Sequence, residues 1–202
     1  ARQVACITIS GLLAHSRKDM SGPVLSVVEA GAETAASMPV KRVGVISTCF
    51  THSTRCYPDS IEKLAPEKSV FSHGCPDLAR LVETYVGDPA GQEILDRDIR
   101  SNLDGLVYRD RIECCVLGCT HFPLVAENIR RLYPGLPLID PAEQMVQAVG
   151  DYLREQELMN DQRFQGTLEI YTTASAEEYR EKAAKVGLFP VTAVREYSAT
   201  AV

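Results

Sequence analysis

Several hallmarks of nucleic-acid-binding, membrane and metal proteins are missing from this 202-residue sequence. It has no block of Lys or Arg, and its formal net charge of −6 disfavours a nucleic-acid partner, because phosphate contacts need a basic surface. No apolar run approaches the roughly 20 residues that span a bilayer. We find no Gly-rich phosphate loop, and no CxxC pair beside other suitably spaced Cys or His. We therefore expect neither a bound nucleotide nor a structural zinc ion.

The cysteines and the first residues predict the compartment and the completeness of the chain. Seven cysteines, an odd number without a regular framework, favour a reducing, cytoplasmic location over a disulfide-stabilised one. There is no initiator Met, and the sequence begins almost directly in a predicted strand at residues 4–9. We therefore expect an N-terminal part of the protein to be missing.

Short apolar segments rich in β-branched residues alternate with helical patterns along the chain. Strands are predicted at residues 4–9, 42–47, 69–71, 112–117, 136–139, 168–171 and 191–194. Helices are predicted at residues 21–32, 60–64, 76–82, 92–106, 124–133, 142–156 and 176–186. This order, with almost continuous apolar strands, predicts an α/β fold in which helices cover both faces of parallel sheets.

Two cysteines close predicted strands in similar surroundings. Cys119 follows an apolar run in VLGCTHFPLV (residues 116–125), with His121 two positions later. Cys6 belongs to VACITIS (residues 4–10) at the end of the first strand, and Thr8 follows it two positions later. Ligands of parallel sheets bind at the carboxyl ends of strands, so two such turns facing each other would place thiols on opposite sides of one small ligand.

Paired thiols of this kind suit racemisation at a Cα atom, which needs a base on one face and an acid on the other. A thiol can do both, because its ordinary pKa of about 8.5 lies near operating pH. His121, an ionisable group beside Cys119, would tune the pKa of that thiol. The remaining thiols are more typical of inert packing; these are Cys49, Cys56, Cys75, Cys114 and Cys115.

Residues 117–124 (LGCTHFPL) resemble the C-terminal signature of the glutamate racemases, cofactor-independent enzymes of the aspartate/glutamate racemase superfamily. Residues 5–8 (ACIT) resemble the first cysteine motif of that family, and residues 43–57 resemble its hydroxyl-rich middle motif. Residues 75–83 (CPDLARLVE) resemble a further family segment, whose Glu lies near the second catalytic site.

This resemblance implies roles for individual residues. Cys6 and Cys119 would exchange the Cα proton on opposite faces of glutamate, His121 would support Cys119, and Glu83 would assist on the same side. Four hydroxyls would bind the substrate, those of Thr8, Thr48, Thr51 and Thr120. No metal, pyridoxal phosphate or other cofactor is implied. The product, D-glutamate, would supply bacterial peptidoglycan synthesis and hence cell shape.

The matching cysteine turns and the resemblance predict two pseudo-symmetric α/β domains with parallel sheets flanked by helices and the active site in the cleft between them. The first domain would be discontinuous, built from residues 1–30 and 139–202, and the second would comprise residues 31–138. The expected partner is the small molecule glutamate, and we expect no binding to nucleic acid or to a membrane. Whether the protein forms a homodimer stays an open question.

Other functions stay open because the chain departs from the family pattern. Ile7 stands where the family has Asn, and the Asp-Ser-Gly turn that the family carries upstream would precede Ala1. Ile7 cannot hydrogen-bond a substrate, which favours a catalytically inactive small-ligand binder as the alternative. A related racemase acting on aspartate or hydantoin is disfavoured by His121. A Cys/His hydrolase would leave Cys6 unexplained.

Overall fold

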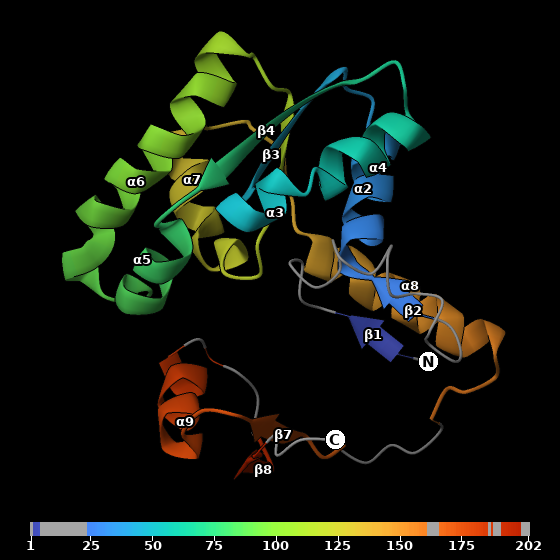
Figure 1. Ribbon diagram of the computed structural model, residues 1–202, viewed down its shortest axis with the longest axis vertical. Helices are drawn as coiled ribbons and strands as arrows, with labels where there is room; N and C mark the ends of the chain where they lie inside the picture. Colours follow the sequence, from blue (N-terminus) through green and yellow to red (C-terminus); the bar gives the residue numbers. More distant parts are fainter. Residues whose placement is uncertain (1, 5–23, 161–165, 186, 188–190, 199–202) are drawn as a thin grey trace.

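The computed structural model describes residues 2–4, 24–160, 166–185, 187 and 191–198. Strands and helices alternate along most of this part of the chain, and helices cover both faces of a central sheet (Figure 1). The predicted α/β class with parallel sheets flanked by helices is therefore confirmed. Within the described residues, no helix is both long and apolar enough to cross a membrane.

The carboxyl ends of the strands in the central sheet all lie on the same side of the molecule, because the strands are parallel. The sheet contains four parallel strands in the order β4-β3-β5-β6. Their bounds are β3 (Arg42–Thr48), β4 (Ser69–Cys75), β5 (Cys114–Gly118) and β6 (Leu138–Ile139). The register pairs Thr48 with Cys75 and Ser47 with Gly118. The turns after β3, β4 and β5 therefore emerge side by side, where ligands of parallel sheets bind.

Alternate residues of the central strands enter two separate cores. Val45 and Val116 pack on one face, against α2 (Val27–Ser37), α4 (Cys56–Leu64) and α8 (Pro141–Glu155). Ile46 and Leu117 pack on the other face, against α5 (Leu78–Tyr85), α6 (Gln92–Asp104) and α7 (Ala126–Leu132). Burial on both faces follows from the nearly continuous apolar sequence of these strands.

Short helical segments connect the larger elements. They are α3 (Cys49–Ser53), the 3-10 turn η2 (Pro89–Gly91), the π-helical segment η3 (Gly105–Arg109), and the 3-10 turn η4 (Phe122–Val125). The segment η3 follows directly on α6. The helix α3 begins directly after β3, whereas a three-residue turn, Cys119 to His121, separates β5 from η4. The hydroxyl-rich motif therefore continues from β3 into α3, and the Cys-Thr-His motif forms the turn between β5 and η4.

Two smaller parallel sheets complete the described chain. One pairs β1 (Arg2–Val4) with β2 (Val24–Ser26). The other pairs β7 (Glu169–Thr172) with β8 (Ala193–Glu196), and α9 (Ala176–Lys185) lies between these strands in the sequence. The C-terminal strand–helix–strand order agrees with the prediction.

The helix predicted to start at residue 21 was wrong over residues 24–26, which form β2. Pairing with β1 explains the difference, because Val24 and Leu25 suit a strand as well as a helix and the partner strand decides. The helix itself begins at Val27. Of the strand predicted at residues 4–9, only Val4 lies within the described residues. The division into two domains stays a prediction.

Candidate active site

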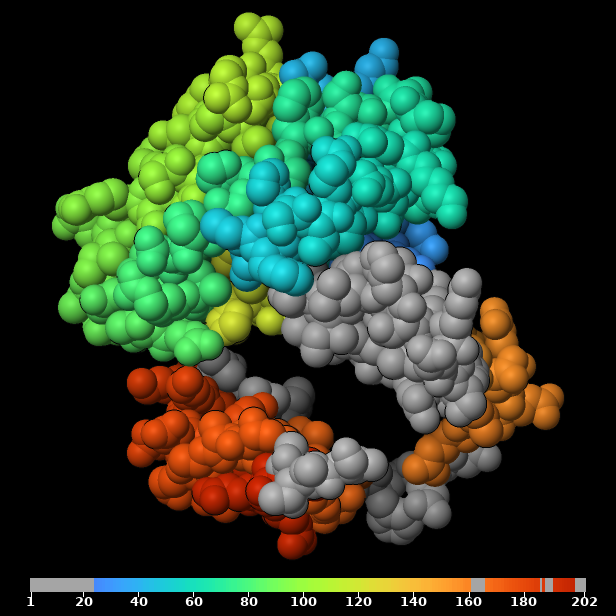
Figure 2. Space-filling model, in the orientation of Figure 1, coloured from blue at the N-terminus to red at the C-terminus, as the bar shows by residue number. Residues whose placement is uncertain are grey.

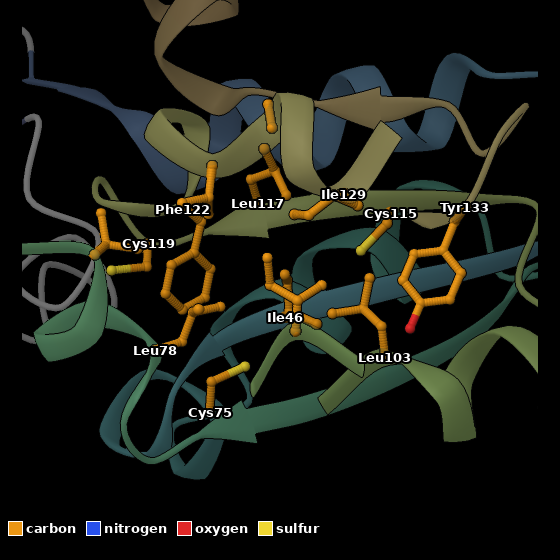
Figure 3. Close-up of a cluster of buried hydrophobic side chains, with 14 of the residues drawn as sticks. Ile46, Cys75, Leu78, Leu103, Cys115, Leu117, Cys119, Phe122, Ile129 and Tyr133 are labelled. Atoms are coloured by element: carbon orange, nitrogen blue, oxygen red, sulfur yellow. The ribbon is translucent and has the colours of Figure 1, made fainter. Parts of the chain in front are cut away.

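The Cys-Thr-His turn is anchored against the central sheet. Gly118 lets the end of β5 approach β3 closely, because a Cβ atom there would lie 2.8 Å from the carbonyl oxygen of Ile46. The ring of Phe122 is completely buried and points into the core toward Leu78 and Ile46 (Figure 3). Cys119 is only 6% exposed. Core packing therefore fixes the backbone that carries Cys119.

Three side chains form a hydrogen-bonded chain at this turn. The Sγ atom of Cys119 lies 3.6 Å from Nδ1 of His121, and Nε2 of His121 lies 2.8 Å from Oε1 of Glu83. Glu83 comes from α5, 38 residues earlier in the sequence. Both ring nitrogens thus have a partner, which fixes the orientation of the imidazole. The structure brings together three of the four predicted catalytic residues.

The contacts of His121 favour its protonated form. They raise the pKa of His121 from 6.5 to about 9, mainly through the contact with Cys119 and further through Glu83, while burial acts in the opposite direction. A doubly protonated ring can donate a hydrogen bond from each nitrogen at once, so these two contacts stabilise the protonated form and raise the pKa. The same ring is the main cause that lowers the pKa of Glu83. At neutral pH the pair is therefore an imidazolium beside a carboxylate.

A lysine that the sequence analysis missed extends this chain. The Nζ atom of Lys182, on α9, lies 3.3 Å from Oε2 of Glu83, the oxygen that His121 does not use. A pocket of about 170 Å³ lies between α5, the turn and α9, and His121 and Lys182 are among its lining residues. No sequence signal singled out Lys182, which is one of several charged residues on a mostly exposed helix.

The predicted substrate hydroxyls of the middle motif lie together at the end of β3. Thr48 caps α3, and its Oγ1 atom accepts a hydrogen bond from the backbone N–H of Thr51 at 3.3 Å. The same hydroxyl donates to Oγ1 of Thr51 at 3.1 Å. Thr51 is buried, and Ser53 bonds to the backbone of Phe50. A helix-capping role thus accounts for part of this motif.

The remaining predicted site residues divide into two groups. Thr120 lies in the Cys119 turn with an exposed side chain. Cys6, Ile7 and Thr8 lie outside the described residues, so the partner thiol and its neighbours stay predictions. Within the described chain, no group of three or more His, Cys, Asp or Glu residues could hold a metal ion.

Three other thiols, those of Cys75, Cys114 and Cys115, are buried in the two cores. Burial raises the pKa of Cys114 to about 11 and that of Cys115 to about 12, so both stay protonated at neutral pH. Burial also raises the pKa of Cys75 strongly. These three thiols suit packing, since a buried, protonated thiol is a poor nucleophile and base.

Comparison with known proteins gives a consistent result. The family model described as Asp/Glu/Hydantoin racemase matches residues 3–149. A glutamate racemase from Syntrophus aciditrophicus is 34% identical over 174 residues, which cover 84% of this chain and 63% of that protein. A glutamate racemase from Trichormus variabilis is 37% identical over 148 residues, which cover 72% of this chain and 49% of that protein. The chain thus spans about half to just under two thirds of the length of these relatives.

Solved structures resemble nearly the whole chain. A glutamate racemase isoform from Bacillus anthracis has a TM-score of 0.88 at 26% identity, covering 98% of this chain and 73% of that one. Glutamate racemase from Thermus thermophilus, in complex with beta-chloro-D-alanine, has a TM-score of 0.81 at 31% identity, covering 98% and 72%. The Francisella tularensis enzyme, in complex with D-glutamate, has a TM-score of 0.85 at 25% identity, covering 97% and 72%.

Proposed function

The chain belongs to the Asp/Glu/hydantoin racemase family, and we propose that its protein is a cofactor-independent glutamate racemase that uses two thiols. The observation that carries this proposal is the contact chain from Cys119 through His121 to Glu83 at the carboxyl edge of a parallel sheet. Named glutamate racemases among the relatives support the choice of substrate.

The reaction is a proton exchange at the Cα atom of glutamate. In one direction the Cys119 thiolate takes the Cα proton from one face, and the Cys6 thiol gives its proton to the other face. Cys119 then carries a thiol and Cys6 a thiolate, so the free enzyme after this turnover is ready for the reverse direction. The Cα–H bond breaks and re-forms with inversion, and no electron is gained or lost.

His121 and Glu83 act on the Cys119 side of this exchange. The imidazolium donates from Nδ1 toward the Cys119 sulfur, which stabilises the thiolate form needed to accept a proton. Glu83 accepts from Nε2 and holds the ring in that orientation. Such positioned acid–base groups contribute typically about 10²–10⁴-fold to a rate.

Substrate binding would involve the hydroxyls at the strand ends. Thr48 and Thr51 lie at the end of β3, and Thr120 follows Cys119, so all three belong to the edge that carries the site. Thr8 would take the same part beside Cys6. The ligands of the related crystal structures, D-glutamate and beta-chloro-D-alanine, support an amino acid as the occupant.

The proposed site lies in a cleft between two pseudo-symmetric domains, residues 1–30 with 139–202 and residues 31–138. We place the reaction in the cytoplasm, where free thiols persist and where D-glutamate would enter peptidoglycan synthesis. All the cysteines within the described residues are free, which supports this placement.

One sequence feature favours a second candidate function. Ile7, next to Cys6, offers no hydrogen bond to a substrate carboxylate or ammonium group. A catalytically inactive homologue that binds a small ligand such as glutamate would tolerate this residue. The two functions differ in one observable, the formation of D-glutamate.

The test incubates the protein with L-glutamate and no added cofactor. Chiral chromatography follows D-glutamate. Cys119→Ala and Cys6→Ala should each abolish its formation, because each direction needs both thiols. Cys49→Ala is the matched control, since Cys49 is an exposed thiol one residue after β3. Glutamate binding without any D-glutamate from the unaltered protein would establish the binding function instead.

A further inference from the structure

The carboxylate of Glu83 is shared between two cations from different parts of the chain. Oε1 accepts from Nε2 of His121 at 2.8 Å, and Oε2 faces Nζ of Lys182 at 3.3 Å. Lys182 lies 99 residues after Glu83, on α9. Figure 2 shows the C-terminal residues, in orange and red, next to the green region that contains α5. One carboxylate therefore links the Cys119 turn to α9.

We propose that Lys182 is a positioning residue of the site, whose ammonium group holds the second oxygen of Glu83 and so limits how strongly Glu83 binds the proton of His121. This inference deepens the proposed racemase function and rests on it for its consequence in catalysis. The Lys182–Glu83 pair is mostly exposed, so its effect on folding stability is small. The consequence of the Lys182–Glu83 pair is a change in how strongly the imidazole of His121 binds its proton.

The direction in which Lys182 changes the pKa of His121 follows from simple electrostatics. A lysine ammonium near a carboxylate offsets part of its negative charge, and it also repels the positive charge of an imidazolium beside that carboxylate. Both effects disfavour the protonated ring. Glu83 and Cys119 act in the opposite direction and raise the pKa of His121. Lys182 thus offsets part of the rise in the pKa of His121 that Glu83 and Cys119 cause.

The charged and titratable groups around the ring come from each element packed against it. Cys119 lies at the end of β5, Glu83 lies on α5, and α9 contributes Lys182, Lys185 and Tyr179 to the adjoining pocket. Of the two lysines, Lys182 is the one paired with Glu83. Lys185 is therefore a matched control, a cation on the same helix and in the same pocket.

Histidine titration by NMR tests this directly, without reference to catalysis. The full chain is labelled with ¹⁵N, the His121 signals are identified from their loss in His121→Asn, and spectra are recorded from about pH 5.5 to 10.5. In Lys182→Met the pKa of His121 should rise by about half a unit, the scale of an exposed charge pair. Lys182→Arg should restore the original value, because the positive charge returns.

The controls make the result decisive. Lys185→Met should shift the pKa of His121 by much less than Lys182→Met does. An unchanged or lowered pKa in Lys182→Met, or an equal rise in both variants, would overturn the assignment of Lys182. Circular dichroism of each variant confirms that the fold is retained, and Lys182→Gln provides a second neutral variant with the same expected rise.

Kinetics separates this inference from the proposed function. If the protein racemises glutamate, the high-pH limb of its kcat/KM profile should move upward in Lys182→Met by the same half unit, with less than a twofold change in KM. If the pKa of His121 measured by NMR rises but the high-pH limb of the kcat/KM profile does not move, Lys182 acts on the imidazole but not on the reaction. No racemisation by the unaltered protein would count against the proposed function alone, because the NMR result stands by itself.

Discussion

The stability of the fold should depend on pH through His121. Its pKa is about 9 in the folded chain, against 6.5 for an unperturbed imidazole. Because the folded-state pKa lies above the unfolded one, the folded chain binds more protons between these two values. The contribution of His121 is therefore complete below about pH 6.5 and is lost as the pH rises through about 9.

The magnitude follows from the shift and from the exposure of the ring. A pKa difference of about 2.5 units corresponds to at most roughly 3.4 kcal/mol, at about 1.36 kcal/mol per unit. The side chain is 33% exposed, so water screens part of this interaction. We expect about 1 kcal/mol to remain, a measurable part of the roughly 5–15 kcal/mol that stabilises a domain.

Urea unfolding of the native chain and of His121→Gln at several pH values measures this contribution. The difference in free energy of unfolding between the two should be largest near pH 6 and should shrink by about 1 kcal/mol by pH 10. In a Glu83→Gln background the shrinkage should be smaller, because one of the contacts that raise the pKa is absent. A difference that stays constant with pH, or grows, would refute the reasoning.

Three further predictions concern the turn and its neighbours. Phe122→Ala should lower the free energy of unfolding by about 3–5 kcal/mol, and Phe122→Leu by clearly less, because the ring is completely buried; equal urea midpoints would contradict this. Gly118→Ala should cost about 1–3 kcal/mol and change the rate at which a thiol reagent labels Cys119, since the added methyl meets the Ile46 carbonyl; unchanged labelling would show that the turn does not depend on this approach. Ile7→Asn should tighten glutamate binding in calorimetry, and unchanged or weaker binding would show that another residue already supplies the contact.

The buried strands were the most predictable part of the fold. The apolar residues of β3 and β5 can only be buried on both faces, so the sequence alone implies a covered parallel sheet. Residues 24–26 were misassigned because an apolar segment of this kind is compatible with both helix and strand. Pairing with β1 is a long-range interaction, and local periodicity carries no information about it.

The site was predictable to the extent that its residues are close in the sequence or belong to a recognisable motif. Cys119 and His121 are two positions apart, so their contact could be expected from the turn alone. Glu83 was identified only through the resemblance, since nothing local connects α5 to that turn. Lys182 was not predicted, because an exposed lysine on a polar helix looks like any other until the helix is placed.

Solvent deuterium incorporation tests the central claim most directly. The complete gene product is incubated with L-glutamate in deuterated water without added cofactor, and the D- and L-glutamate pools are separated and analysed by mass spectrometry. Proton removal on one face and return on the other predicts D-glutamate that carries one deuterium at Cα, with little deuterium in the remaining L-glutamate at early times. Deuterium-free D-glutamate would contradict the two-thiol exchange, and tight glutamate binding with no D-glutamate at all would contradict racemase activity itself.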